Sequence, residues 1–152
     1  MLHSDHGVVG LGYQGLSLDE YVSRVVDAGA DIVVDVRLNA ISRKPGFSKT
    51  RLSAALGHAG VQYEHFRMLG NPKDNRQGFW NPDSFEGVQS RRHFANLLRQ
   101  DEPWQAVRLI ADLARERKVV LLCFEACEEH CHRSIILKSV QELLEGASVI
   151  SC

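Results

Sequence analysis

Apolar and polar positions follow one another along the chain in blocks that predict strands and helices in turn. Uninterrupted apolar runs predict buried strands, and segment 61–66 alternates apolar and polar residues as a strand with two different faces does. The predicted strands cover residues 8–12, 32–36, 61–66 and 119–125, and a short last strand covers 149–150. Apolar residues at helical spacing predict helices over 17–29, 49–58, 85–100, 103–118 and 135–144.

This order of elements is typical of an α/β fold. We predict a single domain over residues 1–152, with three layers and a mainly parallel sheet of about five strands covered by helices on both faces. Right-handed crossovers would bring the polar loops that follow the strands to one edge of that sheet. Any chemical site is therefore expected at the carboxyl ends of the strands.

Composition narrows the function classes. A chain of 152 residues with 44% hydrophobic content fits one ordinary globular domain. The net charge of -1 gives no overall basic field, so charge alone indicates neither nucleic-acid nor membrane binding. The first six residues lack the pattern of a signal peptide, and no apolar run reaches membrane-spanning length. We expect a cytoplasmic protein that does not contact membranes.

The strongest candidate chemistry follows the fourth predicted strand. Cys131, His132 and Arg133 begin the next helix, where the helix terminus and a neighbouring cation lower the pKa of a thiol. Cys131 would then be a nucleophile or redox thiol, His132 a proton carrier and Arg133 an anion-binding group. In the structural alternative Cys131 packs as a small apolar residue, His132 bonds to the backbone, and Arg133 pairs with Glu125 or Asp35.

A second group of charges follows the strand at 32–36. Asp35 and Arg37 leave this strand, and Arg43 and Lys44 lie in the loop behind it. Cations clustered at the carboxyl end of a strand suit an anionic ligand. The alternative is that Asp35 and Arg37 form a structural pair while Arg43 and Lys44 are solvated.

Three more polar residues complete the predicted binding set. Tyr13 lies in the turn after the first strand, Ser48 is predicted to cap the helix that follows it, and Asn71 lies in a long polar loop. Such loops are more often binding loops or lids than filler. Phe79 and Trp80 in this loop would either stack on a ring of the ligand or pin the loop to the body of the protein.

A formal dinucleotide motif, GxGxxG, spans Gly10 to Gly15. However, Ser17 and Glu20 form a capping box that starts the helix only after the third glycine. In a nicotinamide or flavin site the helix begins inside the glycine run, so that its N-terminus meets the pyrophosphate. The pattern therefore favours a glycine-rich turn.

Cys123, Cys127 and Cys131 crowd into one strand and loop, which favours free thiols, a metal site or a reactive cysteine over a disulfide framework. The spacing from Cys127 to Arg133 matches the Cys-x5-Arg loop of thiolate phosphatases, but the loop lacks glycine and carries two glutamates that would repel phosphate. Zinc would accept the thiols and imidazoles of residues 127–132, although so short a segment aims them poorly at one ion. No cofactor is predicted, and zinc stays an alternative.

Several motifs together resemble the bacterial family DUF488: Asp35-Val36-Arg37, Pro45-Gly46-Phe47-Ser48, Leu69-Gly70-Asn71-Pro72, Leu121-Leu122-Cys123-Phe124-Glu125 and His130-Cys131-His132-Arg133-Ser134. The resemblance implies a compact Rossmann-like α/β domain, and it implies no activity because the family is named for an unknown function. Its motif residues fall on Asp35, Arg37, Glu125, Cys131, His132 and Arg133.

The chain departs from this family after the first strand. The family often has Gly-His-Ser or Gly-His-Thr there, whereas this chain has Gly10-Leu11-Gly12-Tyr13. A polar contact of that histidine is either missing or supplied by Tyr13 or His65.

The function that these residues favour is an enzyme, a hydrolase or transferase, for a phosphate-bearing ligand such as a nucleotide or nucleic-acid fragment. Arg37 and Arg133 would bind the anion, and Asp35 or Glu125 would act as base or ribose contact beside Cys131 and His132. The alternatives are a non-catalytic binding module with a structural ion network and a Cys/His metal-binding protein. The pattern predicts no oligomeric state.

Overall fold

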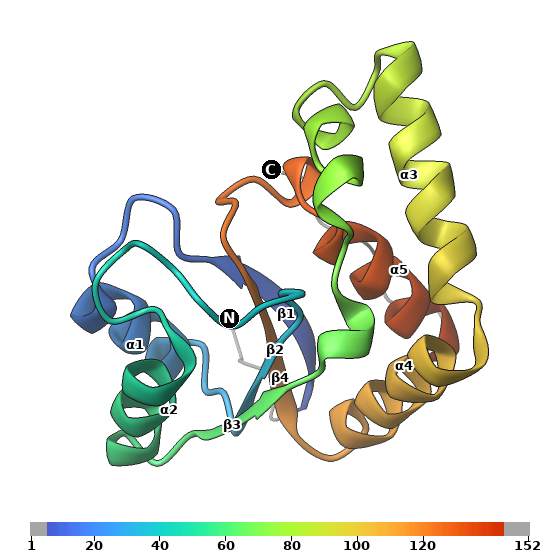
Figure 1. The fold of residues 1–152 in the computed structure, drawn as a ribbon. Coiled ribbons are helices and arrows are strands. Elements are labelled where there is room, and N and C mark those ends of the chain that lie inside the picture. The colour runs from blue at the N-terminus through green and yellow to red at the C-terminus, as the bar shows by residue number, and fades with distance from the viewer. Residues whose placement is uncertain (1–5, 145–152) are drawn as a thin grey trace.

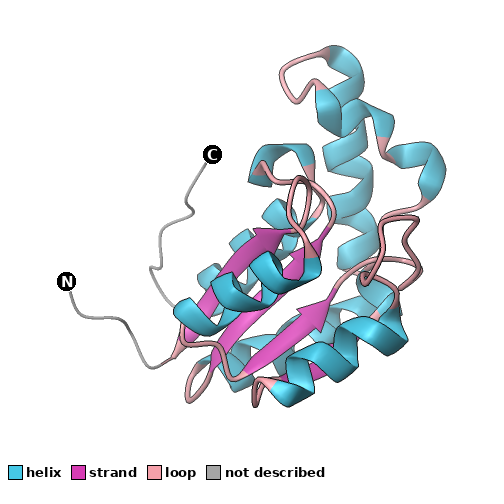
Figure 2. Cartoon of the chain, turned by 90° about the vertical axis from the view of Figure 1, so that its left-hand side faces the viewer, coloured by secondary structure: helices cyan, strands magenta, loops and turns pink. Residues whose placement is uncertain are grey.

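The computed structural model describes residues 6–144, which form a four-stranded parallel sheet between two layers of helices (Figures 1 and 2). The sheet has the order β1-β4-β2-β3 and consists of β1 (Gly7–Gly12), β2 (Ile32–Asp35), β3 (Gln62–His65) and β4 (Lys118–Cys123). The parallel α/β prediction is confirmed. The expected count of about five strands is one too high for the described residues, because the strand expected at 149–150 lies outside them.

The helices divide between the two faces of the sheet (Figure 1). One layer contains α1 (Leu18–Asp27) and α2 (Lys49–His58), and the other contains α3 (Phe85–Leu98), α4 (Asp101–Ala114) and α5 (Arg133–Leu143). Successive residues of a strand point to opposite faces. Accordingly Leu121 of β4 joins the apolar core under α3, α4 and α5, while Leu122 joins the core under α1 and α2.

The capping box predicted for α1 is present. The Ser17 hydroxyl accepts the backbone N–H of Glu20 at 3.1 Å, and the Glu20 carboxylate accepts the N–H of Ser17 at 2.9 Å. Ser48 stands at the corresponding position of α2, but its hydroxyl makes no capping bond. It accepts the backbone N–H of Ser42 at 3.0 Å instead, so the prediction that its side chain caps the helix is wrong.

The long polar loop is built from three single turns of 3-10 helix, Arg67–Leu69, Lys73–Asn75 and Gln77–Trp80. Asn75 fixes this segment against α3, because its amide donates to Asn71 Oδ1 at 3.0 Å and to the Ser90 carbonyl at 2.9 Å. Phe79 is fully buried in the core under α3, α4 and α5, which confirms the pinning role for this residue. Trp80, by contrast, remains 44% exposed.

Strand β4 ends at Cys123, two residues before the predicted end. The loop that follows contains one 3-10 turn, Glu128–His130, and leads directly into α5. The thiol of Cys123 therefore belongs to the carboxyl end of the strand, where a site can use it. None of the helices within residues 6–144 combines the length and the apolar character needed to span a lipid bilayer.

Candidate functional site

A cavity of about 370 Å³ opens at the carboxyl edge of the sheet. Its lining comes from Tyr13 after β1, residues 37–41 after β2, residues 71–80 after β3, and residues 123–132 after β4. Parallel strands bring the loops at their carboxyl ends together in this way. The cavity lies where the sequence analysis expected the polar loops to meet.

Two thiols and an imidazole form a buried cluster at this cavity. Cys123 is the last residue of β4, while Cys131 and His132 directly precede α5. The His132 Nδ1 atom lies 3.5 Å from the Cys131 sulfur and 3.9 Å from the Cys123 sulfur. From the sequence, Cys131 and His132 were assigned to a site, whereas Cys123 was counted among the crowded cysteines and given no role of its own.

The His132 ring is held in one orientation by the backbone. Its Nε2 atom lies 2.8 Å from the carbonyl oxygen of Val36, and a carbonyl can only accept, so Nε2 carries a hydrogen. In the neutral ring Nδ1 is then the unprotonated nitrogen that faces the two sulfurs. The ring also makes an edge contact with Phe94, at 5.1 Å between centroids, which fixes its plane.

The cluster separates the pKa values of its two thiols. Burial raises the pKa of Cys131, and the neighbouring Cys123 raises it further. Burial also acts to raise the pKa of Cys123, but the hydrogen bond from Cys131 and the charge of His132 outweigh it and lower that pKa well below the ordinary thiol range. For His132, burial acts to lower the pKa, and Cys123 more than compensates, so the pKa rises. Cys123 is thus the more acidic of the two thiols.

Glu125 adds a carboxyl group beside this pair. Its Oε1 atom lies 3.4 Å from the Cys123 sulfur, and the residue lines the cavity. Burial raises the pKa of Glu125 to about 7, and the charge of Cys123 acts in the same direction. The structure therefore places Glu125, Cys131 and His132, three of the predicted catalytic residues, around one point and adds Cys123 to them.

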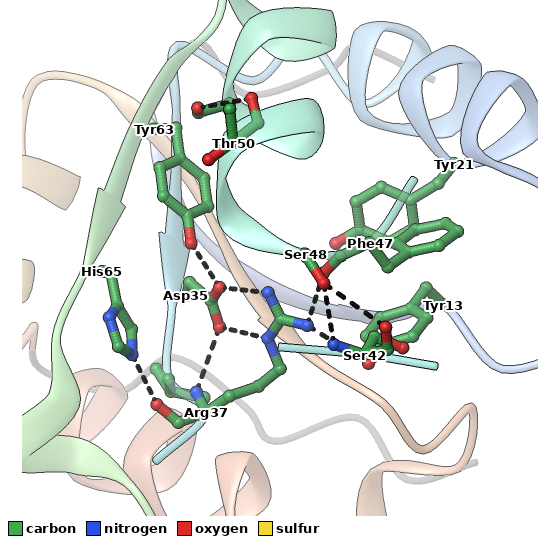
Figure 3. A network of polar contacts seen from close by, with 12 residues as sticks. Tyr13, Tyr21, Asp35, Arg37, Ser42, Phe47, Ser48, Thr50, Tyr63 and His65 are labelled. Atoms are coloured by element: carbon green, nitrogen blue, oxygen red, sulfur yellow. Dashed lines mark hydrogen bonds and ion pairs between the residues drawn. The ribbon is translucent and has the colours of Figure 1, made fainter. Parts of the chain in front are cut away.

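Asp35 and Arg37 form a bidentate pair next to the cluster (Figure 3). The Arg37 Nε donates to Asp35 Oδ1 at 2.9 Å and its Nη2 donates to Oδ2 at 2.6 Å. The Asp35 carboxylate also accepts the hydroxyl of Tyr63, and the Arg37 Nη1 donates to the Phe47 carbonyl at 2.7 Å. Most donors of Arg37 are thus used within the protein, which agrees with the structural-pair alternative for these two residues.

Tyr13 and His65, the two residues considered as substitutes for the family's histidine, both contact Arg37. The Tyr13 hydroxyl accepts from Arg37 Nη1 at 3.3 Å, and His65 Nε2 lies 2.8 Å from the Arg37 carbonyl oxygen (Figure 3). The Tyr13 ring stacks on Phe47, with centroids 4.3 Å apart and planes 9° apart. Tyr13 lines the cavity, yet only 3% of it is exposed, so it shapes the wall more than it offers a surface.

Arg133 is fully buried and does not line the cavity. Its Nε donates to Glu128 at 2.9 Å and its Nη2 donates to the Ala126 carbonyl at 3.3 Å. It therefore pairs with Glu128, and not with Glu125 or Asp35 as the structural alternative had it. A phosphate held between Cys127 and Arg133 would have to displace this carboxylate, which argues against the phosphatase loop.

The glycines of the formal dinucleotide motif make room for these groups. A Cβ atom at Gly10 would overlap the Glu128 carboxylate, and one at Gly12 would overlap the backbone carbonyl of Glu125. Gly10 and Gly12 are thus required by the close approach of the loop after β4 to strand β1. The interpretation as a structural glycine turn accounts for the pattern.

Of the remaining predicted binding residues, one lines the cavity and two do not. Asn71 lines it, but its amide is bonded to Asn75. Arg43 is exposed and Ser48 is bonded to Ser42, and neither lines the cavity. The cysteine prediction is confirmed for Cys123 and Cys131, which are free thiols, and is wrong for Cys127, which is disulfide-bonded.

Two residues of the cavity wall, Asn39 and Arg76, were not predicted from the sequence. His130, which the sequence suggested only as a zinc ligand, also lines the cavity, and its ring centroid lies 5.4 Å from that of Trp80. Arg76 lies in a loop rich in turn residues, and no sequence pattern distinguishes it from the other polar residues there as a cavity residue. The signal for Cys123 was its position as the last apolar residue but one before the polar loop.

A family model, described as a domain of unknown function, DUF488, matches residues 17–140. The match spans most of the chain, from the start of α1 to Val140 within α5. The chain belongs to the DUF488 family. Searches of curated proteins and of solved structures gave no match. Family membership confirms the resemblance seen in the motifs, and it assigns no activity to this DUF488 protein.

Proposed function

We propose that this DUF488 protein is an enzyme, a hydrolase or transferase, for a phosphate-bearing ligand such as a nucleotide or the end of a nucleic-acid strand. The observation that carries the proposal is the cluster of Cys123, His132 and Glu125 at a cavity of about 370 Å³. Pockets of about 300–1,000 Å³ accept ligands of this size. Thiol, imidazole and carboxyl groups within reach of one another are the usual means of hydrolysis and group transfer. The proposal keeps the cytoplasmic location expected from the sequence.

Aromatic side chains support a ligand with a flat ring. Trp80 and Phe124 line the cavity and remain partly exposed, at 44% and 38%. A base stacked on an aromatic side chain gains about 1–3 kcal/mol. Trp80 therefore takes the stacking role that the sequence left open, while its neighbour Phe79 anchors the segment.

Arg76 is the best placed contact for the phosphate. It lines the cavity and is exposed, and its Nε donates to the Asn71 carbonyl at 3.1 Å. Among residues 6–144, no hydrogen bond or ion pair uses its two terminal nitrogens. We therefore assign the anion contact to Arg76, with Arg37 as a neighbouring positive charge. Arg133 is too deeply buried for this role.

The non-catalytic alternative explains only part of the structure. That alternative expected a buried ion network of Asp35, Arg37, Glu125 and Arg133. The pair of Asp35 with Arg37 agrees with it, whereas Arg133 pairs with Glu128 instead. Such pairs maintain the shape of the cavity in an enzyme as well. They do not account for a thiol, an imidazole and a carboxyl group gathered at the cavity, and this favours the enzyme.

Ligand binding is tested by thermal shift with AMP, NAD, ADP-ribose, short single-stranded oligonucleotides and inorganic phosphate. A ligand present at 100 times its Kd stabilises the folded state by about 2.7 kcal/mol, which raises the midpoint measurably. We expect shifts with ligands that carry both a ring and a phosphate. Arg76→Ala and Trp80→Ala should lose them, whereas Arg92→Ala and Phe85→Ala should keep them, since both control residues are exposed and outside the cavity.

Turnover is tested by mass spectrometry of each ligand that binds. Wild-type protein should convert at least one of them, and Glu125→Gln should reduce conversion while still binding the ligand. Absence of any thermal shift together with absence of conversion would refute the proposal. Binding without conversion would favour the non-catalytic module.

A further inference from the structure

We infer that Cys123, Cys131 and His132 form a binding site for a soft divalent metal ion, with Zn²⁺ as the best fitting ion. The two sulfurs and the His132 Nδ1 atom all lie within 4.8 Å of one another, and all three residues are buried. Thiolate and imidazole are the ligands that zinc prefers in proteins. This set differs from the ligands considered in the sequence, since it takes Cys123 from β4 and leaves out Cys127 and His130.

The distances between the donor atoms agree with a tetrahedral zinc centre. Bonds of about 2.3 Å to sulfur and about 2.0 Å to nitrogen, at tetrahedral angles, place sulfur and nitrogen about 3.5 Å apart. The His132 Nδ1 atom lies 3.5 Å from the Cys131 sulfur and 3.9 Å from the Cys123 sulfur. A displacement of a few tenths of an ångström would therefore bring both nitrogen–sulfur separations to the value of a tetrahedral centre.

The surroundings of His132 are those of a metal ligand. A ligating histidine usually donates the hydrogen of its other ring nitrogen to a carbonyl or carboxylate, which directs the free nitrogen at the metal. Here Nε2 donates to the Val36 carbonyl at 2.8 Å, and Nδ1 faces the thiols. The backbone N–H of Arg133 points at the Cys131 sulfur at 3.5 Å, a contact that stabilises a thiolate.

Charge balance also supports a cation at this point. Two thiolates and one Zn²⁺ sum to zero, whereas two buried thiolates without a cation would be strongly destabilised. Arg133 adds one positive charge behind the cluster, but its guanidinium is already paired with Glu128. A bound metal ion would thus allow both thiols to ionise.

Three protein ligands leave a fourth position, and all three residues line the cavity. Sites with three protein ligands and an open position are those in which zinc activates water, while closed sites with four ligands are structural. Glu125 lines the same cavity, with Oε1 3.4 Å from the Cys123 sulfur. Metal binding rests on the geometry of the donor atoms alone. Only its use in hydrolysis rests on the proposed function.

Cobalt provides the test, because tetrahedral Co²⁺ bound by thiolates gives charge-transfer and visible bands that other geometries do not. The protein is stripped with a chelator, kept in a non-thiol reductant and titrated with Co²⁺, then with Zn²⁺ to displace it. We expect one ion per chain. Cys123→Ser, Cys131→Ser and His132→Asn should each weaken binding by about 100-fold or more, because even loss of an outer-shell partner costs 10–100-fold.

Two controls separate metal ligation from folding. His130→Asn removes an imidazole from the same cavity wall but outside the donor set, and it should bind Co²⁺ like wild type. Far-UV circular dichroism in chelator shows whether each cysteine or histidine variant is folded. Where Cys123→Ser fails to fold, Cys123→Ala is measured in its place.

The inference is overturned if reduced wild-type protein gives no thiolate-to-cobalt bands, or if folded His132→Asn binds as wild type does. Because this titration contains no nucleotide, its failure leaves the ligand-binding proposal untouched. Conversely, Co²⁺ binding by a protein that shows neither a thermal shift with any ligand nor conversion of one would refute the proposed function and leave the metal site standing.

Discussion

At the scale of single residues, Arg37 shows how a charged side chain is kept inside the fold. Its guanidinium meets the Asp35 carboxylate through two bonds, and a third nitrogen donates to the Phe47 carbonyl. Two charges removed from water repay their desolvation only when the geometry is good and the remaining donors are satisfied. The pair meets both conditions, so its main contribution is to hold the strand end in one shape.

Removal of the Asp35 carboxylate should therefore destabilise the protein strongly. Asp35→Ala leaves the Arg37 guanidinium buried without its partner, which costs about 3–5 kcal/mol. Tyr63→Phe removes only the hydroxyl that donates to the same carboxylate and should cost about 1 kcal/mol. Urea unfolding of both variants measures the two values. Equal losses would contradict this account of the pair.

Arg133 should behave in the same way although it does not line the cavity. Arg133→Ala leaves Glu128 in a largely buried position without its cation, so we expect a loss of about 3 kcal/mol or more. The control is Arg115→Ala, which breaks the exposed pair with Asp112 and should cost about 0–1 kcal/mol. Chemical denaturation of the two variants under the same conditions measures the difference. A loss as small as that of the control would place Arg133 outside the structural network.

At the scale of elements, the approach of one loop to strand β1 determines where glycine is needed. Gly12→Ala would drive a methyl group into the Glu125 carbonyl, which is backbone and cannot rotate away as a flexible side chain can. The loop between β4 and α5 would be displaced, and it carries Glu125 and Cys131. We expect a destabilisation of about 1–3 kcal/mol, typical of overpacking, together with loss of Co²⁺ binding.

Gly57→Ala is the matched control for this substitution. Gly57 lies within helix α2, where a Cβ atom would meet nothing within 4 Å. Alanine in a helix interior is more stable than glycine by about 0.5–1 kcal/mol. Gly57→Ala should therefore raise the unfolding midpoint and leave metal binding unchanged. Thermal unfolding and Co²⁺ titration measure both effects. If Gly57→Ala also lowers the midpoint or metal binding, the effect of Gly12→Ala is not specific to its contact with Glu125.

The elements also show which local signals were readable in the sequence. Ser17 and Glu20 carry their capping box in the sequence itself, so the start of α1 was predictable. Ser48 has the same residue type at the start of α2, but the bend of its preceding loop brings the Ser42 backbone to its hydroxyl first. A contact between a loop backbone and a side chain produces no periodic pattern in the sequence, so it could not be predicted from it.

The candidate site was predictable only in part, for the same reason. The position of His132 at a strand-to-helix loop could be seen, and so could its proximity to Cys131. Cys123 looked like a strand residue because an apolar run does not show where hydrogen bonding stops, and β4 stops at that residue. Arg76 joins the cavity wall through the path of three short 3-10 turns, which sequence periodicity does not encode.

At the scale of the whole molecule, the central sheet connects two apolar cores. One core lies under α1 and α2, and the other lies under α3, α4 and α5. Each buried strand contributes alternate residues to the two cores, so both layers of helices pack against the same sheet. The cavity lies at the carboxyl edge of this shared sheet, and the segment 71–80 that forms one wall is anchored in the second core by Phe79.

We therefore expect residues 1–152 to unfold as one cooperative domain. Leu121 and Leu122 are adjacent, both fully buried, and point into different cores. Leu121→Ala and Leu122→Ala should each reduce the free energy of unfolding by about 2–5 kcal/mol.

Trp80 lies in the segment anchored in the core under α3, α4 and α5, and Trp104 packs against that core. Tryptophan fluorescence therefore reports on the face of the sheet opposite to Leu122. If the domain is cooperative, Leu122→Ala lowers the urea midpoint seen by fluorescence as much as the midpoint seen by far-UV circular dichroism. A fluorescence midpoint that stays at the wild-type value, while the circular dichroism midpoint falls, would instead divide the chain into two layers that unfold independently.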